Sequence, residues 1–280
     1  MMQVSWYPGH MTKAKRMMQS DMKLIDLVIE LLDARIPKSS RNPDIDELAK
    51  GKSRLVLLNK SDLADPSKNE EWVSFFADQG ISAILIDSKN RKGFEKINGA
   101  IEDACRERTE RDRKRGIVGR PVRAMVVGIP NVGKSTFINT LVRRASTKTG
   151  NKPGVTKGKQ WIKLNKSVEL CDTPGILWPK FEDEKTGIDL AFIGSINDEI
   201  IDETELSCEL MVFLKDAYPG VLFQRYDIDE KKETAEILEC IARKRGCIKK
   251  GDQPDYEKAA RIVLDEFRSG RLGKITVESP

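Results

Sequence analysis

A glycine-rich segment at residues 128–135, GIPNVGKS, follows the apolar residues 125–127 and precedes TFINTLV, which has helical spacing. The segment matches GxxxxGK[ST], in which backbone N–H groups wrap phosphate oxygens, the lysine reaches the β and γ oxygens, and the hydroxyl binds Mg²⁺. Lys134 and Ser135 take the last two roles here. The pattern arises by chance in about 1% of chains of this length. Its neighbours complete the predicted nucleotide-binding set: Asn131, Val132, Gly133 and Thr136.

Two further segments extend this phosphate chemistry. The sequence DTPG at residues 172–175 closes the strand-like VELC, which places Asp172 to hold the Mg²⁺ shell and the Gly175 N–H near the γ-phosphate. Thr156 lies in the intervening Gly/Pro loop, and we expect it to close over Mg²⁺. A bare DxxG occurs about once per chain by chance, so only its place after residues 128–135 makes it informative. Lys134, Thr156 and Gly175 are therefore predicted to act in catalysis.

The sequence NKSD at residues 59–62 follows the apolar RLVLL and has a chemistry specific for guanine. The Asp62 carboxylate can accept hydrogen bonds from guanine N1–H and N2–H₂ together, whereas adenine presents an acceptor at N1. We expect Asn59 to tie this loop to the phosphate loop and Lys60 to lie along the base plane. Ser88, in the loop after the next apolar run, is a second candidate base contact, although a serine in a surface loop is often only solvated.

The elements that must position these residues alternate between apolar runs and helical patterns. The runs that read as buried strands are 24–32, 55–58, 81–86, 125–127 and 168–171. Such alternation predicts an α/β fold, with a parallel sheet covered by helices on both faces. After Pro179 the remaining segments have helical spacing, so we predict a nucleotide-binding domain at 1–179 and a smaller all-α domain at 180–280.

The clearest helix of the second domain is predicted near its end. Tyr256, Ala260, Val263 and Phe267 recur at the spacing of one helix face, and Gly270 follows at the position where helices commonly end.

The motifs occur in an unusual order, because the guanine-recognition loop precedes the phosphate-binding loop. A doubly wound sheet binds ligand at the carboxyl ends of its strands, so the site survives permutation when the old termini are joined. The basic segment 105–123, with eight Lys or Arg and three acids, is the predicted join. In the permuted order, the nucleotide-binding domain ends just after residues 172–175, which sense the γ-phosphate. A structural change at these residues therefore has a short distance to travel to the next domain and its partner surface.

Composition bounds the class of protein. The chain has 280 residues, 39% hydrophobic residues and a formal charge of +5, which favours a polyanionic partner without requiring one. Five scattered cysteines without a CxxC pair, and one histidine, argue against a disulfide framework or a zinc site. No signal peptide or membrane-length apolar run is present, so we expect a cytoplasmic protein without a membrane partner. We also expect a monomer.

With these motifs in this order, the sequence resembles the YlqF/RbgA family of circularly permuted GTPases, which assist assembly of the large ribosomal subunit. YPGHM at 7–11, DARIP at 33–37 and the ending ARKRGCIKKG...FRSGRLGKIT also carry the resemblance, which runs from about residue 5 to 277. It implies a Ras-like permuted G domain, a carboxy-terminal RNA-binding domain, and a Mg²⁺-dependent GTPase stimulated by the pre-ribosome. Asp252 stands after Gly251 where the family pattern favours a second glycine.

The resemblance implies two further roles. Ile176 follows DTPG where many GTPases have a glutamine that orients the attacking water, and His10 is the family's proposed substitute. A lone histidine is more often structural, so both roles of His10 remain open. Asn131 matches an asparagine that coordinates K⁺ in related GTPases, or else it is a residue that tolerates the turn.

Residues 241–280 carry ten Lys or Arg against six acids, which favours binding of ribosomal RNA. Charge runs are also common on solvated faces, so charge alone leaves this open. The candidate RNA-binding residues are Arg243, Lys244, Arg245, Lys249, Lys250, Arg268, Arg271 and Lys274.

Two other functions remain as alternatives. A P-loop kinase acting on a small molecule would share residues 128–135, but NKSD argues against it. A GTP sensor without meaningful turnover is compatible with the missing glutamine.

Overall fold

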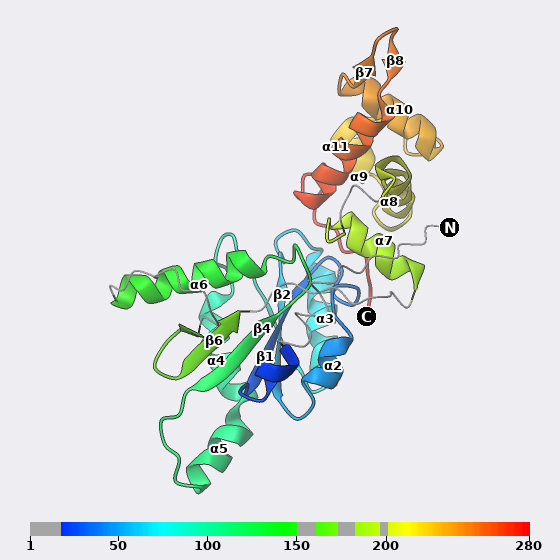
Figure 1. Ribbon diagram of the computed structural model, residues 1–280. Helices are drawn as coiled ribbons and strands as arrows, with labels where there is room; N and C mark the ends of the chain where they lie inside the picture. Colours follow the sequence, from blue (N-terminus) through cyan, green and yellow to red (C-terminus); the bar gives the residue numbers. More distant parts are fainter. Residues whose placement is uncertain (1–17, 150–160, 173–182, 197–200) are drawn as a thin grey trace. The chain divides into compact units, whose positions relative to one another are not determined.

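The computed structural model describes residues 18–149, 161–172, 183–196 and 201–280 (Figure 1). The chain forms two compact units: a sheet unit built from Ser5–Lys180 with Glu278–Pro280, and a helical unit that contains Phe181–Val277. No helix among the described residues is long and apolar enough to cross a membrane.

The sheet unit has six strands in the order β3-β2-β1-β4-β6-β5. Their bounds are Leu27–Asp33 for β1, Ser53–Asn59 for β2, Ser82–Leu85 for β3, Val122–Val127 for β4, Trp161–Lys163 for β5 and Val168–Asp172 for β6. The strands from β3 to β6 pair in parallel, whereas β5 pairs with β6 antiparallel. The predicted α/β fold is confirmed. Within this sheet the sequence analysis missed the short edge strand β5, whose side chains are partly exposed, and the prediction of an all-α second domain also missed a two-stranded ribbon there.

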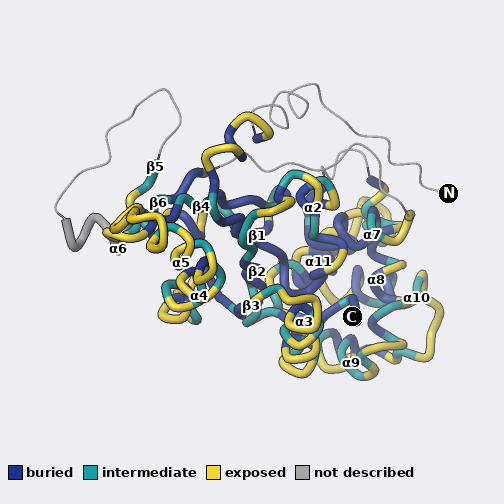
Figure 2. The backbone as a smooth tube through the Cα atoms, turned by 90° about the horizontal axis from the view of Figure 1, so that it is seen from below, coloured by how far each residue is buried: buried dark blue, intermediate teal, exposed yellow. Residues whose placement is uncertain are grey.

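Helices cover both faces of this sheet. Figures 1 and 2 show α2 and α3 on one face and α4 and α6 on the other. The bounds are Asp44–Leu48 for α2, Pro66–Asp78 for α3, Ile97–Ala104 for α4, Arg106–Lys114 for α5 and Lys134–Thr149 for α6, with a 3₁₀ turn at Phe94–Lys96. The core against α3 joins Trp72 and Phe76 to the strand residues Leu32, Val56 and Leu58.

Strand β1 begins three residues later than the apolar run predicts. The Leu24 N–H donates to the Asp21 carbonyl at 2.9 Å and the Ile25 N–H to that of Met22 at 3.1 Å, which closes two turns before the strand. Leu24 is accordingly 47% exposed. Hydropathy alone cannot separate an apolar turn residue from the strand beside it.

The helical unit contains α7 (Glu184–Phe192), α8 (Glu203–Ala217), α9 (Val221–Tyr226), α10 (Thr234–Lys244) and α11 (Tyr256–Arg268). On α11, Ala260, Val263 and Phe267 are buried as their spacing predicts, whereas Tyr256 is exposed.

A short antiparallel ribbon joins α10 to α11, with β7 at Ile248–Lys249 and β8 at Gln253–Pro254. At its turn Gly251 has φ 82° and Asp252 has φ 58°. Aspartate is one of the few residues that tolerates this left-handed conformation. The absence of a second glycine therefore leaves the turn intact.

The chain ends on the sheet unit. The Glu278 carboxylate accepts hydrogen bonds from the backbone N–H groups of Lys38 at 2.7 Å and Ser39 at 2.9 Å, and from the Ser39 hydroxyl. The Trp72 Nε1–H donates to the Glu278 carbonyl at 3.4 Å. These contacts fasten the tail to the loop that follows β1.

Candidate functional site

Three strands bring the candidate residues to one edge of the sheet. Strands β1 and β2 are parallel neighbours whose last residues, Asp33 and Asn59, are register partners. Strand β4 lies on the other side of β1 and runs in the same direction, so residues 128–133 leave the sheet at the same edge. This carboxyl edge is where open α/β sheets bind ligands.

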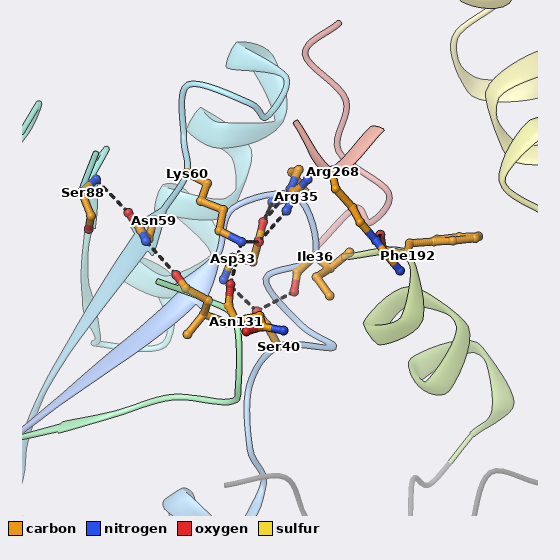
Figure 3. Close-up of polar contacts among 11 residues, drawn as sticks. Asp33, Arg35, Ile36, Ser40, Asn59, Lys60, Ser88, Asn131, Phe192 and Arg268 are labelled. Carbon is orange, nitrogen blue, oxygen red and sulfur yellow. Dashed lines mark hydrogen bonds and ion pairs between the residues drawn. The ribbon is translucent and has the colours of Figure 1, made fainter. Parts of the chain in front are cut away.

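Asn59 ties three loops together at this edge (Figure 3). Its Nδ2 donates to the Val132 carbonyl at 2.7 Å, and its Oδ1 accepts from the Ser88 N–H at 3.0 Å. The side chain is only 2% exposed, so these hydrogen bonds satisfy both ends of a buried amide. One residue thus fixes the NKSD loop against the phosphate loop and against the loop after β3.

Residue 133 of the phosphate loop must be glycine because it packs against the Asn59 side chain. Gly133 has φ 93°, and a Cβ added there would lie 2.4 Å from the Asn59 Nδ2. Any larger residue would collide with the amide and adopt a strained backbone conformation. The second glycine of GxxxxGK[ST] therefore has a packing role in addition to its predicted approach to phosphate.

Lys60 forms a second bridge between the same two loops. Its Nζ donates to the Asn131 carbonyl at 2.7 Å and pairs with Asp33 Oδ2 at 2.9 Å. Arg35 completes the group through two parallel hydrogen bonds to the Asp33 carboxylate, from Nε at 2.9 Å and Nη2 at 2.8 Å. We call Asp33, Arg35 and Lys60 the Asp33 cluster (Figure 3).

Two of the three residues in the Asp33 cluster are buried, whereas the Lys60 side chain is 25% exposed. Asp33 is 0% and Arg35 1% exposed. Burial by itself raises the pKa of Asp33, but the charges and hydrogen bonds of Arg35 and Lys60 outweigh it and hold this pKa well below its ordinary value. Asp33 is therefore a fixed negative charge that holds Lys60 against the phosphate loop. Sequence analysis quoted Asp33 and Arg35 only as family residues; an acid at the end of a buried strand was the available signal.

Two hydrogen bonds of Ser40 fix the loop after β1 beside Asp33. The Asp33 N–H donates to Ser40 Oγ at 3.1 Å, and that hydroxyl donates to the Ile36 carbonyl at 2.7 Å. Both contacts are buried, so the loop is held in one conformation beside the cluster.

The candidate base contacts lie at the ends of β2 and β3. Burial, together with the nearby charge of Asp87, raises the pKa of the Asp62 carboxyl. Asp87 accepts from the backbone N–H groups of Lys89 and Asn90, each at 2.9 Å, and so shapes the loop that carries Ser88. The Ser88 Oγ is buried without a hydrogen-bond partner among the described residues. A buried hydroxyl in that state is suited to a polar atom of a ligand.

The phosphate end is formed by the start of α6. The helix begins at Lys134, directly after the loop, and the Phe137 N–H donates to the Gly133 carbonyl at 2.9 Å. Ser135 and Thr136 are exposed in its first turn. The backbone N–H groups and the dipole of a helix start favour bound phosphate. Asn131, with φ 62°, takes the sharp turn before the helix.

The γ-phosphate end of the predicted site is described only in part. His10, Thr156 and Gly175 lie outside the described residues. The backbone of Asp172 ends β6 and is the register partner of Val126 on β4, which brings it to the same edge as the phosphate loop. A hydroxyl at residue 135 and a carboxylate at 172 are oxygen donors of the kind that Mg²⁺ prefers.

Several predicted RNA-binding cations of the helical unit are paired within that unit. Arg243 pairs with Glu239 at 3.0 Å and Lys244 with Asp227 at 2.8 Å. Arg245 pairs with Glu266 at 3.2 Å and Lys249 with Asp255 at 3.5 Å. The pairs of Arg243, Lys244 and Lys249 lie at the surface and contribute little to stability, so phosphate can replace the acid at small cost. The Arg245 pair differs, because the Glu266 side chain is only 6% exposed.

Arg268 differs from the other cations because it is tied to backbone. Its Nε and Nη2 donate to the carbonyls of Phe192 at 3.0 Å and Ala191 at 2.8 Å, which caps the end of α7 (Figure 3). Lys250, Arg271 and Lys274 are exposed and have no ion pair in the part of the chain that the structure describes.

Comparison with known proteins places this arrangement among nucleotide-binding families. Residues 123–248 match the model of a family described as "50S ribosome-binding GTPase". The match begins in β4 and takes in the phosphate loop.

Full-length relatives match as well. "Ribosome biogenesis GTPase A" of Priestia megaterium is 46% identical over 281 residues, which cover all of this chain and 98% of the relative. "Mitochondrial ribosome-associated GTPase 1" of Ictalurus punctatus is 33% identical, over 98% of this chain and 92% of the relative. A crystal structure of GNP-bound YlqF from T. maritima has a TM-score of 0.67 at 30% identity, covering 96% of this chain and 98% of that one.

Proposed function

We propose that this chain, which belongs to the ribosome biogenesis GTPase A (YlqF) family, is a Mg²⁺-dependent GTPase that assists assembly of the large ribosomal subunit. The protein is a GTPase that acts in ribosome assembly. We further propose that GTP hydrolysis requires Mg²⁺, that the ribosomal particle stimulates it, and that particular residues carry each step.

One observation carries the nucleotide assignment. Asn59 and Lys60 each join the NKSD loop to the phosphate loop, through the carbonyls of Val132 and Asn131. Two loops that bind opposite ends of one ligand must be held at a fixed separation, and these bridges hold them there. The arrangement supports a nucleotide whose base contacts Asp62 and Ser88 and whose phosphates lie at the start of α6.

The proposed roles follow the chemistry of each group. Asp62 accepts from guanine N1–H and N2–H₂, while Lys134 reaches the β and γ oxygens. Ser135, Asp172 and Thr156 hold Mg²⁺, which when bound neutralises charge that develops on the phosphate oxygens. Gly175 donates to the γ-phosphate. K⁺ at Asn131 belongs to the same proposal.

The proposed partner is the large-subunit precursor and its ribosomal RNA. The exposed Lys250, Arg271 and Lys274 of the helical unit support phosphate binding. Arg243 and Lys244 are paired with exposed acids, which phosphate can replace. We propose that the protein acts in the cytoplasm as a monomer that associates with the particle in its GTP-bound state.

Sedimentation with purified large subunits tests the proposal. We expect more protein to sediment with the subunit in a non-hydrolysable GTP analogue than in GDP, and faster single-turnover GTP hydrolysis when subunits are added. Lys134→Ala is the control, because removal of its amino group impairs GTP binding or turnover.

Nucleotide competition, single-turnover hydrolysis and sedimentation together separate the alternatives. Competition by ATP as strong as by GTP would favour a P-loop kinase. Tight GTP binding with no hydrolysis, with or without subunits, would favour a GTP sensor. Equal sedimentation in GTP analogue and GDP would contradict a switch that depends on the γ-phosphate.

A further inference from the structure

Helix α5 and the linker to β4 are anchored to the sheet unit through one side of the helix. Arg108 Nε and Arg120 Nη2 pair with Asp26 Oδ1 at 3.1 and 3.2 Å, and Arg108 also pairs with Asp112 at 3.2 Å. The side chains of Arg108 and Asp26 are only 13% and 11% exposed. These cations therefore have a structural role.

A second set of cations on the same segment has no such role. Arg111, Arg113, Lys114 and Arg115 are all exposed, and none of them has an ion pair within the described ranges of the chain. Residues 111–120 carry five Lys or Arg and one acid. The outer surface of this segment thus has a local excess of positive charge.

An apolar loop projects beside these cations. Val118 is 86% exposed and Ile117 is 44% exposed. They lie between Gly116 and Gly119, which both have φ 76° and where an added Cβ would meet nothing within 4 Å. We call the surface formed by Arg111, Arg113, Lys114, Arg115, Ile117 and Val118 the basic tip.

Stability of the helix does not account for the basic tip. A cation at a helix C-terminus contributes about 0.3–1 kcal/mol through the helix dipole, and this benefit does not call for four of them. Glu107 and Glu110 precede Arg111 and Lys114 by four residues, the spacing of helix ion pairs. Those pairs do not form between these described residues, although pairs with Asp26 and Asp112 do. An external polyanion is the better match for the excess charge.

We propose that the basic tip is a contact surface for ribosomal RNA, which gives the sheet unit an RNA contact of its own. The proposal rests on the proposed function in ribosome assembly. Clustered Arg and Lys fit the phosphate backbone, and an exposed apolar side chain among them fits the sugar and base surfaces of the same strand.

The position of the tip keeps it clear of the nucleotide. Val122 begins β4 directly after the linker, whereas the phosphate loop follows the other end of that strand at Val127. Six residues of strand span roughly 20 Å. Figure 1 shows α5 at one end of the sheet, so RNA bound there leaves the carboxyl edge open to GTP.

Charge reversal with a matched control tests the contact. The tip variant is Arg111→Glu, Arg113→Glu and Lys114→Glu together. The control is Lys50→Glu, Lys96→Glu and Lys166→Glu, which reverses the same number of exposed positive charges elsewhere on the sheet unit. Both are titrated against purified large subunits, and against protein-free ribosomal RNA, at several salt concentrations in a non-hydrolysable GTP analogue.

We expect the tip variant to bind both targets on the order of 10-fold to 100-fold more weakly, with a salt dependence shallower by about 2 to 3 in log–log slope. The control should bind within a few-fold of the wild type. Val118→Ser should weaken binding modestly and leave the slope unchanged, because it removes no charge. GDP affinity should be equal in all four proteins, which shows that the site is folded.

The outcomes that overturn the inference are distinct. A tip variant that binds like the wild type means that the tip is only a solvated surface, while the proposed function stands. Loss on the subunit with unchanged binding to protein-free RNA means a ribosomal protein as partner and rejects the RNA contact. A wild-type protein that binds neither target would overturn the proposed function, and the basic tip with it.

Discussion

At the scale of single residues, the site depends on pairs that lie far apart in the sequence. Asn59 and Lys60 were recognisable from the NKSD pattern, because guanine recognition needs those residue types at that spacing. The partner of Lys60 was not recognisable. Asp33 comes 27 residues earlier, and only the register of β1 against β2 places the two side chains 2.9 Å apart. A short motif reports local chemistry, whereas this contact is set by sheet geometry.

We predict that Asp33→Asn weakens GTP and GDP binding to a similar extent and lowers the free energy of unfolding by about 3 kcal/mol. The change leaves Arg35 and Lys60 buried or half-buried without their carboxylate, and breaking a buried pair costs about that much. Nucleotide titration and urea denaturation measure the two effects.

Asp62→Asn is the comparison for this variant. Its carboxylate is the proposed contact to guanine, so we expect lost GTP affinity and a gain for xanthosine triphosphate, whose base presents the complementary groups. Asp33→Asn should leave the preference among bases unchanged. A shift of base preference in Asp33→Asn, or wild-type affinity for all nucleotides, would show that the Asp33 cluster does not position the NKSD loop.

At the scale of elements, hydropathy located the strands and the last helix because each is a buried run or an amphipathic face. It failed where burial is partial, as in β5, or where an apolar residue sits in a turn, as at Leu24. Hydropathy also does not predict that the tail, residues 278–280, binds to the loop after β1. Glu278 binds Lys38 and Ser39 across 240 and 239 residues, and an acid near a chain end has no pattern that predicts it.

The tail gives an element-scale prediction. Glu278→Gln should lower the thermal unfolding temperature, at a cost of about 1–3 kcal/mol, because an amide cannot accept from the Lys38 and Ser39 donors as a carboxylate does. Ser279→Ala, at the exposed neighbouring residue, is the matched control and should leave the temperature unchanged. Equal unfolding temperatures for all three proteins would mean that the tail does not stabilise the loop after β1.

At the scale of the whole molecule, the order of the motifs and the order of the strands are consistent. Strand β4, which leads into the phosphate loop, lies beside β1, although β1 opens the described sheet and β4 follows about 90 residues later. The intervening chain runs through α5, the segment expected to join the old termini. The circularly permuted order was predictable from the NKSD and GxxxxGK[ST] motifs, because each motif follows the carboxyl end of a particular strand. The roles of individual cations were not, since ion pairing depends on the folded neighbours.

The last prediction concerns hydrolysis on the ribosomal particle, which requires the chain as a whole. Ile176 follows residues 172–175, and an aliphatic side chain cannot orient the attacking water. His10, which lies outside the described residues, is the single histidine of the chain and precedes the basic TKAKR. We propose that ribosomal RNA holds this segment so that the imidazole orders the water. His10→Ala should therefore bind GTP and the large subunit normally, yet lose particle-stimulated hydrolysis on the order of 10-fold to 100-fold. Single-turnover assays at equal subunit occupancy measure the loss, and slow hydrolysis without particles should change less. Stimulated turnover equal to that of the wild type would make His10 structural and assign the water-orienting group to the ribosome.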